Sequence, residues 1–592
     1  MSYDAKWVAR CLREIADLSE VLDDDAQKAP AYRRAARAVE EAGADVARLA
    51  AAGRLTEIPH VGPAIAAKID AILATGTCPL LERLRARVPE GVRALLGLPG
   101  VGPKTVGVLW RELGVASPGG LAAAARAQRL RALPGFGPKK EQALLQAAEA
   151  FAARAGRMLL GEAFPAARVL VGIALEAGAA AALEVGEVRR REPVVGAIDV
   201  AVACEAAAWE AWEEAARGRL PAELGAARPL EAADDPTAGA WPAVLHALGA
   251  GAPRGLKASL GEVPVRFWWS PPDAWGWALV VLTGPPAAVT RLLASARGVG
   301  AAGGLLVGEA GADAGALRPD PYGFRAPAAE AAVFRALGRE WIPPELRAFP
   351  ERLARLGRLE DLVSLEGWAA ELHAHTSASD GRASLREMAR AALERGYRAL
   401  AVTDHSFALR IARGLDAARL RLQAAEIAEV QRETAGVRLL RGTEADIRPD
   451  GSLDIPEGIE LEWIVASVHS QFGLSREAMT ARVVRALESG RVDVLGHPTG
   501  RLLLRREGYD LDLDAVFEAA QRHGTAMEIN ANPARLDLDG DQAFEALQRG
   551  LVLAVNTDAH SVAELDHVVY GVWMARRAGA RRDEVLNLLP PG

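Results

Sequence analysis

The last third of the chain opens with the run Glu371-Leu-His-Ala-His-Thr-Ser-Ala-Ser-Asp-Gly381. Its first residues have the pattern of a short strand, and successive side chains of a strand point to opposite faces. His373 and His375 therefore lie on the same face, where both can reach one metal ion. Asp380 follows five residues later and adds a carboxylate. The run predicts a strand that ends in a metal site.

Six further strand-like runs follow, most of them succeeded by a helical pattern. The seven runs cover residues 371–376, 399–403, 438–443, 463–468, 492–495, 526–530 and 552–557. Repeated βα units favour a parallel, barrel-like sheet, in which chemistry sits at the carboxyl ends of the strands. Six of the seven runs end on or beside residues of metal-ligating types. These residues are His373, His375, Asp380, His405, Glu444, His469, His497, Asp558 and His560.

Nine such residues at the same end of successive strands indicate a metal centre, although a lone histidine at a strand end is mostly structural. Histidine and carboxylate without cysteine suit Zn²⁺, Mn²⁺ or Fe rather than a thiolate site. Such cations activate a water and stabilise the charge that builds on a phosphoryl group during hydrolysis. We interpret Asp404 as supporting the ligands from behind, and His523 and His567 as surface residues.

Several motifs in this region carry a resemblance to a known family. They are the opening run, Thr-Asp-His-Ser at 403–406, Ala-Ser-Val-His-Ser at 466–470, Gly-His-Pro-Thr-Gly-Arg at 496–501, Glu-Ile-Asn-Ala-Asn-Pro at 528–533 and Thr-Asp-Ala-His-Ser at 557–561. With them, the last third resembles the PHP (polymerase and histidinol phosphatase) domain. The resemblance implies a distorted (β/α)7 barrel with up to three ions, Mn²⁺ or Zn²⁺.

The resemblance also implies how the nine residues share the ions. One ion would be held by His373, His375, Glu444 and Asp558. A second would be held by Glu444, His469 and His497. The third would be held by Asp380, His405 and His560. We further assign Asn532 and Arg535 to contacts with the substrate.

A different motif recurs three times near the start of the chain. It reads Ile58-Pro-His-Val-Gly-Pro63, Leu98-Pro-Gly-Val-Gly-Pro103 and Leu133-Pro-Gly-Phe-Gly-Pro138, each copy lying between two helical patterns. Glycines allow close approach of the backbone, and the amides at a helix start bind phosphate. Three copies in one register favour binding of the DNA backbone over a plain helix–helix turn. The pattern resembles the helix-hairpin-helix motif, which holds DNA without reading its sequence. The residues assigned to DNA are Gly62, Gly100, Gly102, Lys104, Gly135, Gly137 and Lys139.

Charge and composition agree with an anionic ligand for this region. Residues 1–150 contain 21 Lys plus Arg and 17 Asp plus Glu, a net of +4, whereas the whole chain carries −7 and the remainder therefore −11. A basic module on an acidic body is typical of a protein that meets nucleic acid. Three unpaired cysteines, no signal-peptide pattern and no apolar run of membrane-spanning length favour a cytoplasmic, nucleoid-associated protein without a membrane partner.

The middle of the chain predicts a mixed α/β domain over about residues 155–320. Apolar runs at 182–185, 194–203, 263–269 and 279–283 alternate with charged helical patterns. The Pro- and Gly-rich stretch 319–327 predicts a loop, and residues 345–368 predict a helical connector.

Two more stretches extend the resemblance to essentially the full chain. Ala31-Tyr-Arg-Arg-Ala-Ala-Arg-Ala38 and Trp341-Ile-Pro-Pro-Glu-Leu-Arg347, together with the hairpins, resemble bacterial family X DNA polymerases. The resemblance implies a short-gap repair enzyme whose PHP domain is a Mn²⁺-dependent 3′–5′ exonuclease. It divides the chain into a lyase-like helical domain (1–80), a fingers-like helical region (81–155), a nucleotidyltransferase-like palm (156–320), a thumb remnant and linker (321–369) and the PHP domain (370–592).

The palm departs from the family pattern at its metal-binding residues. The pattern Gly-Ser-x-Arg-Arg, Gly-Asp-x-Asp and a later Asp becomes Gly186-Glu-Val-Arg-Arg190, Gly196-Ala-Ile-Asp199 and Arg266. Ala197 and Arg266 thus replace two carboxylates, and only Asp199 remains. Nucleotidyl transfer needs carboxylates that hold Mg²⁺ against the triphosphate, and an arginine repels these ions. We predict that templated synthesis is lost or very weak.

Lys68 matches the family lysine that forms a Schiff base with an abasic sugar, but its basic, DNA-facing setting favours phosphate binding. The leading hypothesis is a metal-dependent 3′–5′ exonuclease or 3′-end phosphoesterase that acts on gapped or nicked duplex DNA. The first alternative is an active gap-filling DNA polymerase in base excision repair. A non-catalytic DNA-end-binding scaffold and a small-molecule phosphatase are further alternatives, against which the nine ligand residues and the hairpins respectively argue.

Overall fold

The computed structural model divides the chain into two compact units, Met1–Ala155 and Gly156–Gly592. It describes residues 5–588 except 25, 44, 99, 153–154, 222–223, 225–226, 232–233, 238–239, 248–251 and 298–321. Pro99 of the second hairpin and the first part of the loop expected at 319–327 lie outside the described residues. No single helix in the described part of the chain could cross a membrane by length and composition, although Pro63–Thr75 and Pro79–Arg87 pass the test as a pair bent by 83°.

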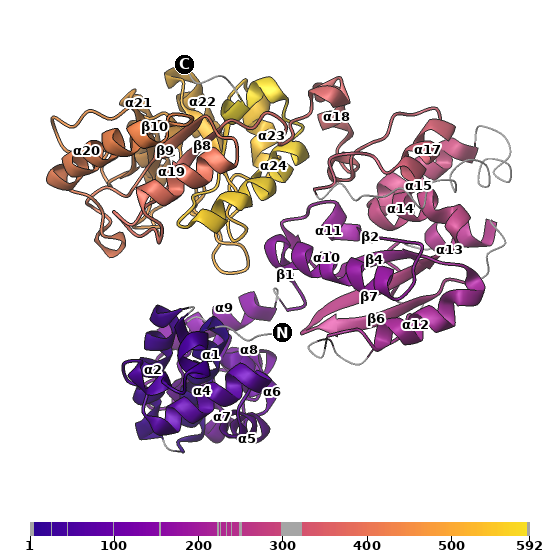
Figure 1. The fold of residues 1–592 in the computed structure, drawn as a ribbon, viewed down its shortest axis with the longest axis horizontal. Coiled ribbons are helices and arrows are strands. Elements are labelled where there is room, and N and C mark those ends of the chain that lie inside the picture. The colour runs from indigo at the N-terminus through magenta and orange to yellow at the C-terminus, as the bar shows by residue number, and fades with distance from the viewer. Residues whose placement is uncertain are drawn as a thin grey trace. The chain divides into compact units, whose positions relative to one another are not determined.

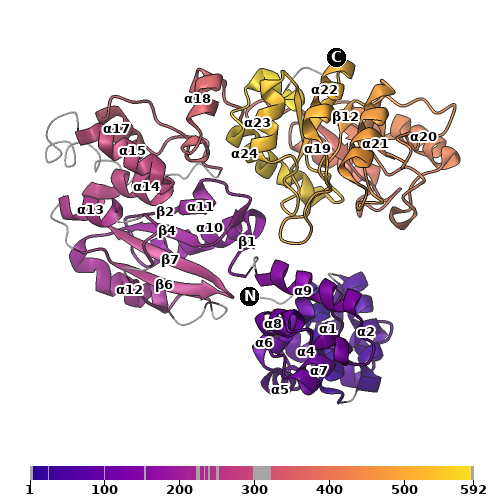
Figure 2. The ribbon, with the colours of Figure 1, turned by 180° about the vertical axis from the view of Figure 1, so that it is seen from behind.

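The first unit consists of helices, seen from opposite sides in Figures 1 and 2. They are α1 (Ala5–Leu22), α2 (Ala29–Ala42), α3 (Asp45–Ala51), α4 (Pro63–Thr75), α5 (Pro79–Arg87), α6 (Glu90–Ala94), α7 (Pro103–Leu113), α8 (Pro118–Arg126) and α9 (Pro138–Ala152). Helix α1 packs on α2, α5 and α7 and buries Leu12, Ile15 and Leu18. Proline starts α4, α7 and α9, where its missing N–H costs no hydrogen bond, so each hairpin leads directly into a helix.

The second unit begins with a five-stranded sheet of order β2-β4-β7-β6-β5. The strands are β2 (Ala181–Val185), β4 (Ile198–Ala203), β5 (Arg228–Pro229), β6 (Gly255–Leu260) and β7 (Val263–Ser270). Only β4 and β7 are parallel within this sheet, and their register sets Asp199 opposite Arg266. A separate antiparallel pair joins β1 (Met158–Leu159) to β3 (Val194–Val195).

Helices cover this sheet and lead out of it. They are α10 (Leu160–Glu176), α11 (Gly186–Arg189), α12 (Trp209–Arg217), α13 (Ala240–Ala247), α14 (Trp275–Thr283), α15 (Pro286–Arg297), α17 (Ala328–Ala336) and α18 (Pro350–Leu356). Tryptophans make up much of the hydrophobic core beside this sheet, since Trp241, Trp269 and Trp275 are fully buried.

Two expectations for this region are wrong. The apolar run 279–283 is the end of helix α14, whose nine residues are all buried. A helix that is surrounded by protein has no polar stripe, so its period does not show in the sequence. Residues 345–368 do not form one helix, because Pro350 begins the short α18 and Gly357, with a φ of +77°, ends it. The 3-10 turns Pro344–Leu346 and Leu359–Asp361 lie on either side.

Seven parallel strands form the rest of the second unit, in the order β14-β13-β12-β11-β10-β9-β8. They are β8 (Ala370–Ala374), β9 (Ala399–Val402), β10 (Arg438–Asp446), β11 (Trp463–Ser467), β12 (Val494–Leu495), β13 (Ala526–Asn530) and β14 (Leu553–Asn556). The first and last strands meet through a parallel bridge between Ala374 and Ala559, where the amide of His375 donates to Ala559 at 2.8 Å. The sheet is thus a nearly closed barrel, as the βα repeats predict.

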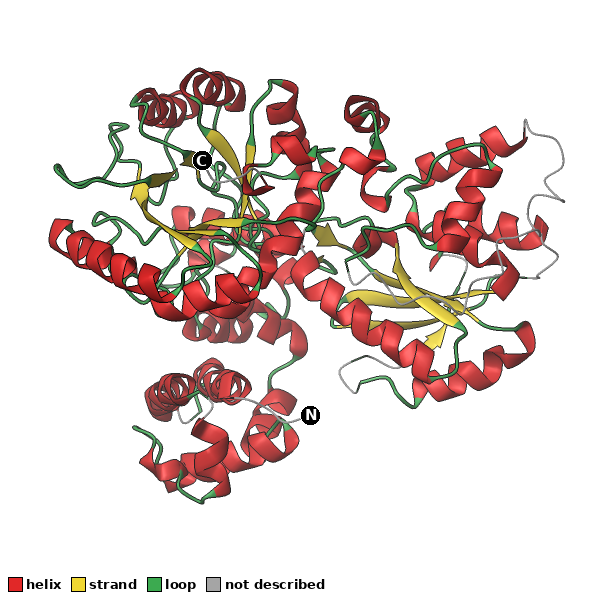
Figure 3. Ribbon diagram, turned by 45° about the horizontal axis from the view of Figure 1, so that its top comes forward, coloured by secondary structure: helices red, strands yellow, loops and turns green. Residues whose placement is uncertain are grey.

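Helices surround these strands, as the red ribbons around the yellow arrows in Figure 3 show. They are α19 (Leu385–Glu394), α20 (Ala417–Glu433), α21 (Arg476–Glu488), α22 (Leu513–His523), α23 (Gly540–Gln548) and α24 (Val568–Arg577). Helices α19 to α23 begin at capping residues, since the side chains of Ser384, Asp416, Ser475, Asp512 and Asp539 accept hydrogen bonds from the first turn.

Candidate metal centre and nucleic-acid-binding hairpins

Glu444, at the carboxyl end of β10, lies at the centre of a cluster of histidines. Its Oε1 atom is 3.0 Å from Nε2 of His497 and 3.2 Å from Nε2 of His469. Oε1 also lies 3.6 Å from Nε2 of His373, and Oε2 lies 2.8 Å from Nδ1 of His405. With Nε2 of His375, 3.6 Å from Oε2, one carboxylate therefore faces five imidazoles that come from four different strand ends.

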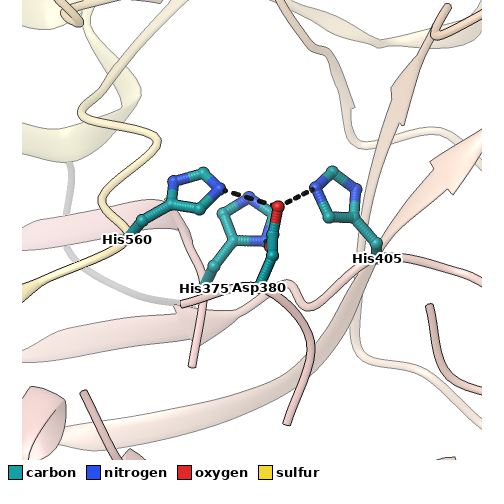
Figure 4. A group of neighbouring side chains, drawn as sticks. All are labelled: His375, Asp380, His405 and His560. Carbon is teal, nitrogen blue, oxygen red and sulfur yellow. Dashed lines mark ion pairs between the residues drawn. The ribbon is translucent and has the colours of Figure 1, made fainter. Parts of the chain in front are cut away.

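Asp558 and Asp380 organise the remaining histidines. Oδ1 of Asp558 is 3.0 Å from Nε2 of His375 and 3.6 Å from Nε2 of His373. Oδ2 of Asp380 is 3.5 Å from Nε2 of His405 and 3.4 Å from Nε2 of His560. Figure 4 shows Asp380 between these two rings, with His375 beside it. All nine side chains singled out in the sequence thus converge at one end of the barrel.

The ligand atoms are close enough together to share cations. Three groups have such atoms within 4.8 Å of one another: His375, Asp380, His405 and His560; His373, His375 and Asp558; and His405, Glu444 and His469. His375 and His405 each belong to two groups. The neighbouring positions therefore share side chains instead of being isolated.

Several buried polar atoms at this point have no directed hydrogen bond. They are Nε2 of His373, both ring nitrogens of His375, Nδ1 of His405 and of His497, and Oε2 of Glu444. A buried polar atom without a partner costs free energy, and coordination of a cation would give one ring nitrogen of each histidine and the Glu444 carboxylate a partner. The residues present therefore fit a metal centre.

The pKa values follow from burial opposed by mutual charge. Burial alone would lower the pKa of His405, but Glu444 and Asp380 raise it to about 10. Burial would likewise lower the pKa of His560, which Asp380 and Asp558 raise to about 9. For Glu444 burial acts upward, yet the surrounding histidines hold its pKa well below the usual range. The carboxylates are therefore ionised and offer negative charge to a cation.

Access to the centre lies on one side. The side chains of His373, His375 and Glu444 are almost completely buried. The side chain of Asp380 is 33% exposed and that of His560 26% exposed. Solvent therefore reaches the centre at Asp380 and His560.

Three buried carboxylates that the sequence analysis missed hold the histidines in place. Oε1 of Glu528 lies 2.7 Å from Nδ1 of His373, and its Oε2 accepts from the amide of His497 at 2.6 Å. Oδ1 of Asp446 lies 3.2 Å from Nδ1 of His469, and Glu371 accepts from the amide of His373. Such partners orient a histidine and set its tautomer. Strand alternation contained a signal for Glu371, which sits two residues before His373.

Asp404 supports the site as expected, because it accepts hydrogen bonds from Thr376, Ser379 and Gln423 behind the loop that carries Asp380. His523 is exposed at the end of α22. The expectation for the second histidine, His567, is wrong, since it is half-buried with an Nδ1 atom that lacks a hydrogen bond. His567 directly precedes α24. Its ring packs edge-on against that of Tyr570, with 6.1 Å between the ring centroids.

Of the two residues assigned to the substrate, Arg535 approaches the centre. Its Nε atom lies 3.9 Å from Oδ2 of Asp558. Asn532 uses its side-chain oxygen within its own loop, where it accepts from the amide of Ala534 at 3.0 Å.

The three hairpins share one backbone geometry. Val61, Val101 and Phe136 each donate an amide hydrogen bond to the carbonyl three residues earlier, at 3.1, 3.2 and 3.1 Å. The residue before each donor has a positive φ, which is +76° at Gly100 and +79° at Gly135. In the first copy His60 takes this position with a φ of +65°. The same turn therefore forms without the glycine, although a side chain adopts this conformation at a cost.

The hairpins present open backbone to solvent. A Cβ atom added at Gly62, Gly100, Gly102, Gly135 or Gly137 would meet nothing within 4 Å. Within the described part of the chain, the amides of Gly62, Gly102 and Gly137 donate no backbone hydrogen bond. Lys104 and Lys139 follow on exposed first turns. Each hairpin thus combines free amides, space and positive charge, the combination that binds phosphate.

Lys68 lies on α4, one turn after the first hairpin. Its Nζ donates to the carbonyl of Ala64 at 2.8 Å and lies 5.8 Å from the centre of the Tyr32 ring. No described carboxylate forms an ion pair with it, so the ammonium can face an anion.

The five-stranded sheet carries an ion pair at two of the positions for which the resemblance implies catalytic carboxylates. Nε of Arg266 lies 2.6 Å from Oδ1 of Asp199, and its second guanidinium nitrogen lies 2.9 Å from Oδ2. Trp268 also donates to Asp199, at 2.8 Å. Burial acts to lower the pKa of Arg266, but Asp199 raises it, so the guanidinium stays charged. The carboxylate that remains is therefore already neutralised.

The neighbouring motif residues are also engaged. Ala197 is buried and offers no ligand atom. Gly186 has a φ of +63°, and a Cβ there would lie 2.8 Å from Oδ2 of Asp199. Oε2 of Glu187 accepts from the amide of Gly196 at 2.5 Å, and Arg190 donates to the carbonyl of Thr283.

Comparison with known proteins identifies the parts of the chain. Residues 5–78 match the helix-hairpin-helix domain, residues 92–150 the SAM-like helix-hairpin-helix tandem and residues 371–532 the PHP domain. The chain is 32% identical to the DNA polymerase/3′-5′ exonuclease PolX of Bacillus subtilis (strain 168) over 588 residues, 98% of this chain and 97% of the relative. It is also 27% identical to a probable phosphatase of Thermoanaerobacter sp. (strain X514) over 37% of this chain and 89% of the relative. A probable phosphatase of Vibrio vulnificus (strain YJ016) is 34% identical over 33% of this chain and 80% of the relative.

Proposed function

Because this chain belongs to the PolX family of DNA polymerases/3′–5′ exonucleases, with helix-hairpin-helix and PHP domains, we propose that its PHP domain is a metal-dependent 3′–5′ exonuclease or 3′-end phosphoesterase. The observation that carries the proposal is the convergence of nine ligand-type side chains, several with buried atoms that lack a hydrogen bond. The sites are proposed for Mn²⁺ or Zn²⁺, up to three ions. Such ions, when bound, supply the positive charge that hydrolysis of a phosphoester requires.

The proposed ligand sets share Glu444. One ion is assigned to His373, His375, Glu444 and Asp558, a second to Glu444, His469 and His497, and the third to Asp380, His405 and His560. The short distances from Glu444 and Asp558 to these rings support this division. Asp380 and His560 border the open side, so they are the residues that meet the DNA end first.

The hairpins are proposed to hold gapped or nicked duplex DNA so that a 3′ end can enter the barrel. The free amides of Gly62, Gly102 and Gly137 and the exposed lysines Lys104 and Lys139 support phosphate contacts. Lys68 is assigned to a phosphate in preference to lyase chemistry, because it follows the first hairpin and no described carboxylate pairs with it.

The palm is proposed to lack templated synthesis. The ion pair between Asp199 and Arg266 supports this, because it occupies the one remaining carboxylate and places a guanidinium where Mg²⁺ is needed. The alternative is an active gap-filling polymerase, which the name of the Bacillus relative favours.

One gel separates these functions. A primer with a 5′ label in a one-nucleotide gap is incubated with Mn²⁺, with and without deoxynucleotides, and resolved on a sequencing gel. We expect the primer to shorten under both conditions, and His375→Ala to abolish shortening. Asp199→Ala is the matched palm variant, and it should shorten the primer as the unmodified protein does.

The opposite results are equally clear. Templated lengthening that Asp199→Ala removes and His375→Ala leaves intact would establish the polymerase alternative. Neither shortening nor lengthening by the unmodified protein, together with no removal of the phosphate from a primer that ends in a 3′-phosphate, would favour a non-catalytic scaffold if DNA is still bound.

A further inference from the structure

The loop that follows β9 exposes hydrophobic side chains beside the metal centre. This loop, residues 406–414, is called the Phe407 loop below. The ring of Phe407 is 46% exposed and Ile411 is 93% exposed, the highest value among the large hydrophobic residues of the described chain that stand out as exposed. Isolated exposed hydrophobics are common, but two in one short loop next to a site are not explained by packing.

Two arginines accompany these residues. The guanidinium of Arg410 lies 5.3 Å from the centre of the Phe407 ring. Arg410 and Arg413 are both exposed, and no carboxylate of the described chain forms an ion pair with either. Most other arginines around the barrel have a carboxylate or carbonyl partner, as Arg395 and Arg419 do. The loop therefore combines an aromatic face, an aliphatic tip and two free positive charges.

The backbone of the loop is held firmly at its base. Leu415 donates its amide to the carbonyl of His405 at 2.7 Å, and Arg419 donates to the carbonyls of Arg413 and Gly414. A Cβ at Gly414 would collide with the carbonyl of Ser406, so the two strands of the loop lie in close contact. The amide of Ala408 donates a hydrogen bond to the carboxylate of Asp454. The exposed side chains thus project from a fixed base and not from a loose segment.

The loop lies on the open side of the centre. It follows directly after His405, one of the nine residues, and Phe407 lies two positions further along, about 7 Å of chain at most. Arg419, which holds the end of the loop, also donates to the carbonyl of Ala378, two residues before Asp380. Asp380 is the more exposed of the two side chains at the opening. A polymer that enters there passes the Phe407 loop.

We propose that the Phe407 loop binds the last nucleotides of the DNA strand whose 3′ end enters the barrel. Phe407 stacks on an unpaired base, Ile411 packs against the same base or its neighbour, and Arg410 and Arg413 contact backbone phosphates. Aromatic and arginine side chains on a rigid support are the elements that bind single strands without regard to sequence. The proposal rests on the exonuclease function proposed above, and it names the residues that position its substrate.

The test compares two substrates of the same protein. One is a single-stranded oligonucleotide with a 5′ label, and the other is bis(para-nitrophenyl) phosphate, a diester that carries no nucleobase and only one phosphate. We expect Phe407→Ala to lower the ratio of oligonucleotide to small-diester hydrolysis about tenfold, the scale of one lost base–aromatic stack. Phe407→Trp should restore the ratio. Leu393→Ala, which removes a leucine of 42% exposure from α19, is the matched control.

Oligonucleotides that lack one base identify the base on which the ring of Phe407 stacks. Removing the base at one of the last nucleotides should slow the unmodified protein about as much as Phe407→Ala does, and should not slow that variant further. Additive losses at every position, or an equal loss on both substrates, would overturn the proposal. Arg410→Ala with Arg413→Ala should weaken the salt dependence of oligonucleotide binding by about two phosphate contacts, whereas Arg421→Ala on α20 should not.

Failure of this proposal differs from failure of the exonuclease function. If the unmodified protein hydrolyses the small diester but no oligonucleotide, the proposed function is wrong. If it degrades the oligonucleotide and Phe407→Ala does so at the same ratio, only the role of the loop is wrong.

Discussion

At the residue scale, the histidines of the centre depend on carboxylates behind them. Glu528 contacts the ring of His373 and the amide of His497, so it orients residues from two strands. Asn530 and Asn556 in turn donate to Glu528, at 3.1 and 3.0 Å. This network is completely buried, which removes competition from water.

The variant Glu528→Gln tests this support. The amide no longer offers two acceptor oxygens, so His373 and the backbone at His497 lose their fixed orientation. We expect the apparent affinity for Mn²⁺, measured by calorimetric titration, to fall about 10- to 100-fold. Glu545→Gln, an exposed glutamate on α23, is the control and should bind Mn²⁺ normally. Unchanged affinity in Glu528→Gln would show that the histidines are held without it.

Much of the residue-scale picture could be predicted from the sequence. Histidines and carboxylates at strand ends reveal themselves because strand alternation and βα repetition are local patterns. The role of Glu528 could not be predicted from the sequence, because its partners His373 and His497 lie far away along the chain. A glutamate inside a strand reads as an ordinary polar residue until its neighbours are known.

At the element scale, helices α11, α14 and α17 meet around one buried glutamate. Glu330 of α17 accepts hydrogen bonds from Arg189 of α11 at 2.6 Å, from Arg347 at 2.7 Å and from Trp341 at 2.8 Å. Arg189 also donates to the hydroxyl of Thr283 at the end of α14. Charged groups this deep are tolerated only when they are paired and hydrogen-bonded.

Stability should therefore depend on the ionisation of Glu330. Burial alone would raise its pKa, but Arg189 and Arg347 lower it from 4.5 to about 2. A folded-state pKa below the unfolded value stabilises the fold fully above pH 4.5, and this contribution is lost as the pH falls toward 2. The shift corresponds to about 3 kcal/mol of the free energy of unfolding.

The comparison of the unmodified protein with Glu330→Gln measures this contribution. At neutral pH we expect the variant to be less stable by about 3 to 5 kcal/mol, because two buried arginines lose their counter-charge. Urea unfolding followed by tryptophan fluorescence reports on this region, whose core is rich in tryptophan. The difference between the two proteins should shrink as the pH falls from 4.5 toward 2. A difference that stays constant over this range would contradict the role of the ion pair.

The hairpins make a separate element-scale prediction. Lys104 and Lys139 stand at equivalent places, the first turns of α7 and α9. Replacing both with alanine should weaken duplex binding equally for all sequences and reduce the slope of log affinity against log salt by about two. Fluorescence anisotropy with gapped duplex DNA at several salt concentrations measures the slope. Lys28→Ala, outside the hairpins, should leave it unchanged.

At the scale of the whole second unit, the five-stranded sheet region and the barrel share a packed interface. The guanidinium of Arg191 lies 4.7 Å from the ring of Phe164 and 4.2 Å from that of Trp573. Arg577 donates to the carbonyl of Arg190 at 2.8 Å, next to the degenerate palm motif. If the sheet region lacks templated synthesis, as proposed above, these contacts give it a structural role toward the barrel.

Arg577→Ala tests this dependence between the two regions. The variant loses the bond to Arg190 and the ion pair with Glu192, at 3.0 Å. Tryptophan fluorescence follows melting of the sheet region, and residual diester hydrolysis follows the barrel. We expect both midpoints to coincide in the unmodified protein and to separate in the variant by about 2–4 °C, the effect of roughly 1 kcal/mol in a domain of this size.

Arg581→Ala removes a half-buried arginine just beyond α24 that pairs with Asp583 and Glu584. It should leave the two midpoints together. Coincident midpoints in Arg577→Ala would show that the interface does not couple the regions.

The sequence by itself determined the βα repeat, the nine ligand-type residues and the three hairpins, and through the family resemblance it predicts that Ala197 and Arg266 replace palm carboxylates. Each of these features follows from a local pattern in the sequence: a strand period, a turn motif or a residue type at one position of a motif. The sequence was misleading for α14. Its residues are buried on every side, so the hydrophobic pattern has no helical period.

Only the tertiary structure decided which side chains share Glu444, how Ala374 and Ala559 close the barrel, and that Arg266 pairs with Asp199. These relations join residues distant in sequence, and their geometry depends on strand register and on the packing of whole elements. The exposure of Phe407 and Ile411 belongs to the same class, because a hydrophobic residue is buried by default until the fold shows that nothing covers it.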